Sequence, residues 1–159
     1  MIGMYEKSGL PIAAEKTAAK LHSGVTDRYG NPYFEHLERV ANRVRDMEYD
    51  VVDETSEIEY YVAAAYLHDV VEDTAATSSD VGTDFGDVIA EAVELLTRND
   101  GETYASYVDK ICYAPHLSGK IARVVKLADL LDHLMGPTMC PKSLVKRYEK
   151  SLYRLISII

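Results

Sequence analysis

Hydrophobic residues recur at intervals of three and four along most of the chain, whereas the alternation typical of strands is almost absent. Glycine and proline lie mostly between these periodic segments, as in the turn formed by Gly30-Asn31-Pro32. The pattern therefore predicts an all-α domain. The expected helices span residues 11–23, 33–47, 55–73, 80–97, 103–114, 117–135 and 141–157.

The length and composition fit one folded domain. The 159 residues are 47% hydrophobic and 27% charged, which is typical of globular chains with a sizeable core. We therefore expect a single domain over residues 1–159. The last segment, 141–157, has one broad apolar face, which predicts packing on the domain, with a contact between copies in a homo-oligomer as the alternative.

The charge and the cysteines narrow the possible partners and compartment. Acidic residues outnumber basic ones 26 to 17, for a net charge of −9, so no DNA, RNA or membrane partner is expected. No signal peptide is evident in residues 1–7, and no run of 18 apolar residues occurs. Cys112 and Cys140 cannot form a disulfide framework, which favours a reducing compartment. We expect a cytoplasmic protein.

The segment 55–73 is the most apolar of the expected helices, yet it ends in carboxylates. Steps of three and four from Ile58 reach Val62 and Ala65 and then Asp69 and Glu72. Because buried charges persist only when they are paired or bound to metal, this end of the helix is a candidate metal site.

His68 and Asp73 add to the same patch. On a continuous helix His68 would lie over Glu72 and Asp69 over Asp73, which collects one imidazole and three carboxylates. A helix C-terminus already carries about half a negative charge, so a bound cation would relieve the repulsion. The alternative is a solvated acidic helix end with His68 packed in the core.

Two further residues complete a mixed set of donors. Asp129 continues the apolar stripe of Ile121 and Val125, although an ion pair with a nearby lysine or arginine would also explain it. His36 follows the turn at residues 29–32, where capping or exposure would be the simpler explanation. Two imidazoles and two carboxylates suit manganese, iron or zinc. The candidate ligands are His36, His68, Asp69 and Asp129.

These residues resemble the H…HD…D signature of the HD phosphohydrolase superfamily. Further segments are similar to the hydrolase domain of RelA/SpoT-type alarmone enzymes, namely residues 30–36, 64–74, 85–86, 96–98 and 125–129. The similarity runs over about residues 13–134, and HDxxED at 68–73 is its most specific part. The resemblance implies an HD-domain helical bundle of about seven helices.

The resemblance also implies an activity. In the family this domain removes the 3′-pyrophosphate from guanosine 3′,5′-bis(diphosphate) and uses one manganese ion, and it occurs in small stand-alone hydrolases. Carried over by position, the four candidate ligands would hold Mn²⁺, while Glu72 and Asp73 would orient and deprotonate the attacking water. A small-molecule nucleotide is then the expected substrate.

The chain departs from the family where the substrate is bound. The family has two adjacent basic residues before the turn, whereas this chain has Asp27-Arg28. It has His133 where the family has asparagine four residues after the last ligand. Arg28, Lys126 and His133 are the expected substrate-binding residues. The departures leave two alternatives open: phosphohydrolysis of another phosphorylated nucleotide, or a non-catalytic nucleotide-binding module.

Overall fold

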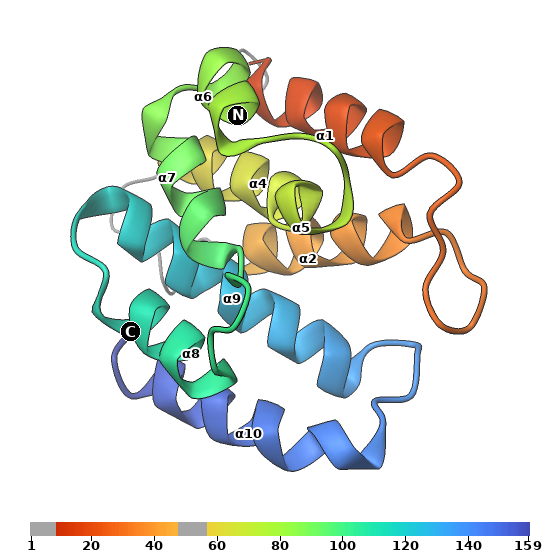
Figure 1. Ribbon diagram of the computed structural model, residues 1–159, viewed down its shortest axis with the longest axis vertical. Coiled ribbons are helices and arrows are strands. Elements are labelled where there is room, and N and C mark those ends of the chain that lie inside the picture. Colours follow the sequence, from red (N-terminus) through yellow and green to blue (C-terminus); the bar gives the residue numbers. More distant parts are fainter. Residues whose placement is uncertain (1–8, 48–56) are drawn as a thin grey trace, which may run out of the picture.

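The computed structural model describes residues 9–47 and 57–159. Within these ranges the only β pairing is an isolated bridge between Thr26 and Pro32, so the all-α prediction is confirmed. Figure 1 shows the arrangement of the helices. They are α1 (Leu10–Leu21), α2 (Phe34–Asp46), α4 (Ile58–Leu67), α5 (Val70–Asp73), α6 (Ser78–Phe85), α7 (Asp87–Leu96), α8 (Tyr104–Tyr113), α9 (His116–Met135) and α10 (Lys142–Ile156).

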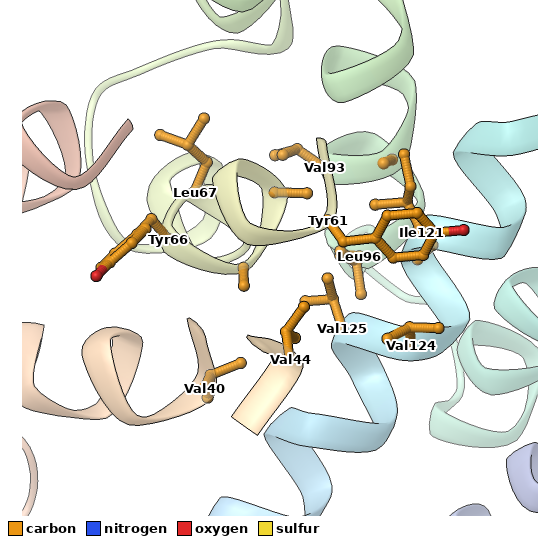
Figure 2. Packing of buried hydrophobic residues seen from close by; sticks show 14 of the residues in the cluster. Val40, Val44, Tyr61, Tyr66, Leu67, Val93, Leu96, Ile121, Val124 and Val125 are labelled. Atoms are coloured by element: carbon orange, nitrogen blue, oxygen red, sulfur yellow. The ribbon is translucent and has the colours of Figure 1, made fainter. Parts of the chain in front are cut away.

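Helix α4 forms the centre of the hydrophobic core. Every residue from Tyr61 to Leu67 is buried, because α4 packs against α1, α2, α7 and α9. Figure 2 shows Val44 of α2 and Val125 of α9 among the side chains of this cluster. Burying a valine or leucine side chain contributes about 1.5 to 3 kcal/mol, so this apolar contact holds α4 firmly between its neighbours.

Helix α9 carries a carboxylate into the interior. Ile121 and Val125 are fully buried, and Asp129 continues the same stripe with only 4% of its surface exposed. This is the register expected from the sequence. The long apolar contact of α9 with α2, α4 and α7 therefore fixes where Asp129 lies.

Helix α10 packs along α9 and α8, as predicted for the last segment. Leu155 is fully buried in this contact. Ile156, the last residue of α10, is exposed instead. The apolar face of α10 is therefore narrower than its sequence pattern suggests.

The prediction of one helix over residues 55–73 is wrong. Residues 55 and 56 lie outside the described residues, α4 ends at Leu67, and α5 begins at Val70. Successive side chains on a continuous helix diverge by about 100°, which would separate the two polar groups at the break. The turn instead brings His68 Nε2 to 3.1 Å from Asp69 Oδ2. The helix is thus interrupted where these two side chains meet.

The predicted helix over residues 80–97 also divides. Helix α6 begins at Ser78, after a capping box formed by Thr77 and Asp80. Between α6 and α7, Gly86 has a φ of 88°, which a residue with a side chain rarely adopts. The two breaks turn the seven expected segments into nine helices in the described ranges.

None of the helices in residues 9–47 and 57–159 combines the length and the apolar composition that crossing a membrane requires.

Candidate active site

His36 lies near the start of α2 and is buried against α9. Its Nδ1 donates to Oδ2 of Asp132 at 2.8 Å, and Arg39 donates to both oxygens of that carboxylate. Burial by itself raises the pKa of Asp132, but the hydrogen bonds from His36 and Arg39 outweigh it and lower this pKa to about 2. Asp132 therefore stays ionised and fixes the orientation of the His36 ring.

His68 and Asp69 occupy the break between α4 and α5. The Nδ1 atom of His68 donates to the carbonyl of Ala65 at 2.7 Å, which leaves Nε2 directed toward Asp69. The Tyr33 hydroxyl donates to Asp69 Oδ2 at 2.6 Å. Each of these two side chains is therefore held by a partner outside the pair.

Asp129 reaches the same place from α9. Its Oδ1 lies 3.2 Å from His36 Nε2 and 3.7 Å from His68 Nε2, while Oδ2 accepts a hydrogen bond from Lys126 at 2.7 Å. The ion pair considered as an alternative from the sequence is therefore present. It occupies one oxygen only, and the other oxygen faces the two imidazoles.

The buried charges shift the pKa values of one another. Burial lowers the pKa of His68, but Asp69 and Asp129 raise it well above its ordinary range. The pKa of His36 is also raised against the effect of burial, mainly because the carboxylate of Asp129 lies 3.2 Å from its Nε2. Burial raises the pKa of Asp129, yet Lys126 leads a group of partners that lower it well below the usual value. The carboxylates of this cluster thus require positive charge among them.

The donor atoms fit a transition-metal ion. Within the described ranges the Nε2 atoms of His36 and His68 are buried without a hydrogen-bond partner of suitable geometry, although carboxylate oxygens lie near them. Two groups of three side chains keep their donor atoms within 4.8 Å of one another. The groups are His36, His68 and Asp69, and His36, Asp129 and His133. The four residues predicted as ligands are therefore brought together, with His133 beside them.

Glu72 and Asp73, predicted to act on the water, line an open cavity of about 560 Å³ together with Arg98. Glu72 accepts a hydrogen bond from the backbone N–H of Arg98. Partial burial raises the pKa of Glu72, and the hydrogen bond from Arg98 opposes this. Asp73 Oδ2 lies 3.6 Å from Nε2 of the buried His22. Each carboxylate of this pair thus has a neighbour from another segment.

Two of the three predicted substrate-binding residues line one cavity. Arg28 and His133 lie at a cavity of about 340 Å³ that also reaches His36. Lys126 is not among the residues that line it. The ammonium of Lys126 is taken up by the ion pair described above and lies 5.1 Å from the ring centre of Tyr107.

Asp27, which stands where the family has a basic residue, closes the turn at residues 27–31. Its carboxylate accepts hydrogen bonds from the backbone N–H groups of Tyr29 at 2.8 Å and Asn31 at 2.9 Å. The carboxylate of Asp27 therefore stabilises the turn, and Arg28 is the only cation in the Asp27-Arg28 pair.

Four side chains around the site were not assigned a role from the sequence. Tyr33 and Asp132 each lie three residues from a predicted ligand, and this spacing could have indicated them. Arg39 supports Asp132. His22 is buried and stacks on Tyr33 with 5.5 Å between ring centres. The local pattern does not indicate its approach to Asp73, because Asp73 is distant in the chain.

Comparison with known proteins identifies a family and several similar chains. A family model described as HD domain matches residues 14–110. Guanosine-3′,5′-bis(diphosphate) 3′-pyrophosphohydrolase MESH1 of Danio rerio is 35% identical over 130 residues, which cover 81% of this chain and 67% of that protein.

Two bacterial relatives are much longer than this chain. The "Probable GTP pyrophosphokinase" of Mycobacterium leprae is 27% identical over 164 aligned residues, covering 96% of this chain but 19% of that protein. The bifunctional (p)ppGpp synthase/hydrolase SpoT of Escherichia coli is 40% identical over 83 residues, covering 52% and 11%. The chain thus spans less than a fifth of either bacterial protein.

A solved structure has a similar fold. It belongs to a metazoan orthologue of SpoT that hydrolyses ppGpp, and it superimposes with a TM-score of 0.69 at 22% identity. The match covers 98% of this chain and 87% of that one. The similarity of fold therefore extends beyond the residues that the family model matches.

Proposed function

Because the chain belongs to the HD-domain family, we propose that it is a metal-dependent hydrolase that removes the 3′-pyrophosphate from guanosine 3′,5′-bis(diphosphate) or a closely related nucleotide. The activity named for the Danio rerio relative supports this proposal. The observation that carries it is the convergence of two histidines and two aspartates from α2, the α4–α5 break and α9.

Manganese is the proposed metal, and His36, His68, Asp69 and Asp129 are its proposed ligands. Their mixed nitrogen and oxygen donors are compatible with this metal. A bound divalent ion supplies Lewis acidity and neutralises negative charge on the phosphoryl oxygens.

The chain's own residues prepare this centre. Asp132 and a backbone carbonyl each accept the Nδ1 proton of one histidine, so both Nε2 atoms face the carboxylates. Tyr33 and Lys126 fix the side-chain orientations of Asp69 and Asp129. Little rearrangement of these side chains is then needed during the reaction, which favours catalysis.

Glu72 and Asp73 are the proposed proton acceptors. Water attacks the phosphorus bonded to the 3′ oxygen, the bond between that phosphorus and the 3′ oxygen breaks, and pyrophosphate leaves. One carboxylate takes the proton of the water, and the 3′ oxygen gains a proton to become a hydroxyl, which yields guanosine diphosphate. The backbone N–H of Arg98 holds one oxygen of Glu72, so the other oxygen remains for the water.

The cavity lined by Arg28 and His133 is the proposed binding place for the nucleotide. Arg28 would contact a phosphate, and a guanidinium can do so with two hydrogen bonds. Lys126 acts in this proposal through Asp129 rather than by touching the substrate. Asp27 stands at the position of one of the family's two basic residues and stabilises the turn instead. One cation fewer is therefore present to recognise the base. This favours a second candidate, a related phosphorylated nucleotide with another base.

We further propose that residues 1–159 act as one domain in the cytoplasm. Helix α9 lies beyond the residues matched by the family model, yet it carries Asp129 and packs against α2, α4 and α7. Both cysteines are free thiols, as is usual in a reducing compartment.

The test is turnover by the purified protein with Mn²⁺ and a panel of phosphorylated nucleotides, with products separated by anion-exchange chromatography. We expect guanosine diphosphate and pyrophosphate from guanosine 3′,5′-bis(diphosphate), and neither product with Asp69→Ala. Turnover of another nucleotide alone would favour the second candidate. No turnover of any nucleotide would favour a non-catalytic nucleotide-binding module.

A further inference from the structure

We propose that His133 is a third histidine ligand of the metal centre and strengthens the binding of nitrogen-seeking ions such as Co²⁺ and Zn²⁺ more than the binding of Mn²⁺. The inference rests on the metal site of the proposed function, but not on the identity of the substrate. It replaces the substrate contact expected for His133 from the sequence.

The position of the His133 ring is the first argument. Its Nε2 lies 3.1 Å from Oδ1 of Asp129, one turn earlier on α9. Its ring centre is 4.8 Å from that of His36, and the donor atoms of His36, Asp129 and His133 lie within 4.8 Å of one another. His133 therefore belongs to a compact group of three donors that shares His36 with the group around His68 and Asp69.

The spacing of the donor atoms is the second argument. Two ligand atoms that are each about 2.1 Å from one ion and meet at a right angle lie about 3.0 Å apart. Oδ1 of Asp129 is 3.2 Å from His36 Nε2 and 3.1 Å from His133 Nε2. Both separations are close to the edge of a single coordination polyhedron.

Lys126 contributes by limiting Asp129 to one oxygen. It occupies Oδ2 at 2.7 Å, so only Oδ1 faces the imidazoles. An ion bound at Oδ1 would then lie within reach of both neighbouring imidazoles, those of His36 and His133. The carboxylate cannot compensate for a missing imidazole by coordinating with both oxygens while this ion pair persists.

Exposure distinguishes His133 from the other two histidines. Its side chain is 39% exposed and lines the cavity of about 340 Å³, whereas the side chains of His36 and His68 are 8% and 3% exposed. His133 can therefore change its side-chain orientation at little cost when an ion binds. It stands between the buried donors and the open cavity, on the side from which an ion can enter.

Replacing an oxygen donor by an imidazole changes which ions bind best. Affinities at nitrogen-containing sites rise from Mn²⁺ through Fe²⁺ to Co²⁺ and beyond, while Mn²⁺ is well served by oxygen ligands. A centre with three imidazoles should consequently discriminate more strongly against Mn²⁺ than a centre with two.

The test compares metal affinities of wild-type protein, His133→Asn and His133→Ala, measured by calorimetric titration with Co²⁺, Zn²⁺ and Mn²⁺ in the absence of nucleotide. We expect both variants to bind Co²⁺ and Zn²⁺ more than about tenfold more weakly, because losing a ligand costs at least as much as losing a residue that only orients one. The loss for Mn²⁺ should be several times smaller. The visible absorption of the Co²⁺ protein should also change in both variants, because it reports the ligand set.

His116→Asn is the matched control, since it makes the same change at the exposed first residue of α9. Its φ of 65° is one that asparagine tolerates well. Metal affinity and the Co²⁺ spectrum should be those of the wild type. Circular dichroism of each variant confirms that the helices are intact.

Two results would overturn the inference. Unchanged affinities and an unchanged Co²⁺ spectrum would show that His133 is no ligand. An equal loss for all three ions would assign His133 only the hydrogen bond to Asp129. Because no nucleotide is used, His133 can be shown to be a ligand even if no turnover is found. If the enzyme is active but the His133 variants keep the wild-type metal preference, this inference is wrong while the proposed function stands.

Discussion

The metal centre and the cavity beside Glu72 hold their carboxylates in contrasting ways. In the centre, Asp129 is buried and paired with Lys126, and Asp69 accepts a hydrogen bond from Tyr33. At the cavity, Glu72 is exposed and accepts a hydrogen bond from a backbone N–H. Burial makes every unpaired charge costly, so each carboxylate of the metal centre needs a positively charged or hydrogen-bonding partner. At Glu72, water can supply the hydrogen bonds that the protein does not.

This difference indicates a division of roles. Changes in the centre should affect metal binding and folding stability together, because the same buried charges serve both. Changes at Glu72 should affect the chemical step while the fold and the metal remain. The following predictions test this contrast, from the largest expected effect to the smallest.

Removing a buried donor should have the largest effect. We expect His68→Ala and Asp69→Ala to lose the bound metal during dialysis and with it all measurable turnover, since each substitution removes a ligand from the buried part of the site. Metal content per chain, measured by mass spectrometry after dialysis, checks this. Equal metal occupancy in the wild type and both variants would refute the ligand assignment.

Glu72→Gln should reduce turnover by about 10² to 10⁴, because it keeps the shape of the side chain but removes the base. Metal content and unfolding temperature should stay near the wild-type values. The same measurements on Asp73→Asn separate the two carboxylates. Full turnover in both variants would mean that neither handles the proton of the water.

Lys126→Met should destabilise the metal-free protein by about 3 to 5 kcal/mol, the usual cost of leaving a buried charge without its partner. Urea unfolding measures this, with Lys146→Met at an exposed position of α10 as control. Added Mn²⁺ should restore part of the loss, because the ion offers Asp129 another cation. A stability equal to that of the control would show that the ion pair is not needed.

Arg28→Ala should weaken nucleotide binding by about 1.5 kcal/mol, roughly tenfold, because a charge-assisted hydrogen bond is lost at an exposed position. The Michaelis constant should rise with little change in turnover number, and metal affinity should not change. An unaltered Michaelis constant would place the phosphate contact elsewhere.

Asp27→Asn should have the smallest effect, confined to the turn at residues 27–31. Burial raises the pKa of Asp27, but hydrogen bonds from Asn31 and Tyr29 outweigh it and lower the pKa below its usual 3.8. A lowered pKa means that the ionised carboxylate stabilises the fold fully above about pH 3.8, and that this contribution is lost as the pH falls through the lower native value. The stability difference between wild type and Asp27→Asn should therefore shrink with acidification across this range. A difference that is independent of pH would contradict this role.

The sequence by itself determined most of the helices and the depth of Asp129. Helical periodicity is a local property, so the spacing of Ile121 and Val125 was enough to place Asp129 on the buried face of α9. The same periodicity gave no warning of the break at His68-Asp69, because an uninterrupted helix fits the apolar spacing equally well. It also predicted one broad apolar face for residues 141–157, although Ile156 in this segment is exposed.

Only the tertiary structure decided which of the polar residues meet. A helical pattern shows which face is buried but not which other helix covers it, so the partners of His36 and Glu72 had to come from packing. Packing placed Asp132 against His36 and brought the backbone of Arg98 to Glu72. The residues of each pair are distant in the chain, so no local spacing could indicate the contact, whereas the ion pair of Lys126 with Asp129 lies within one turn of α9 and could be considered from the sequence.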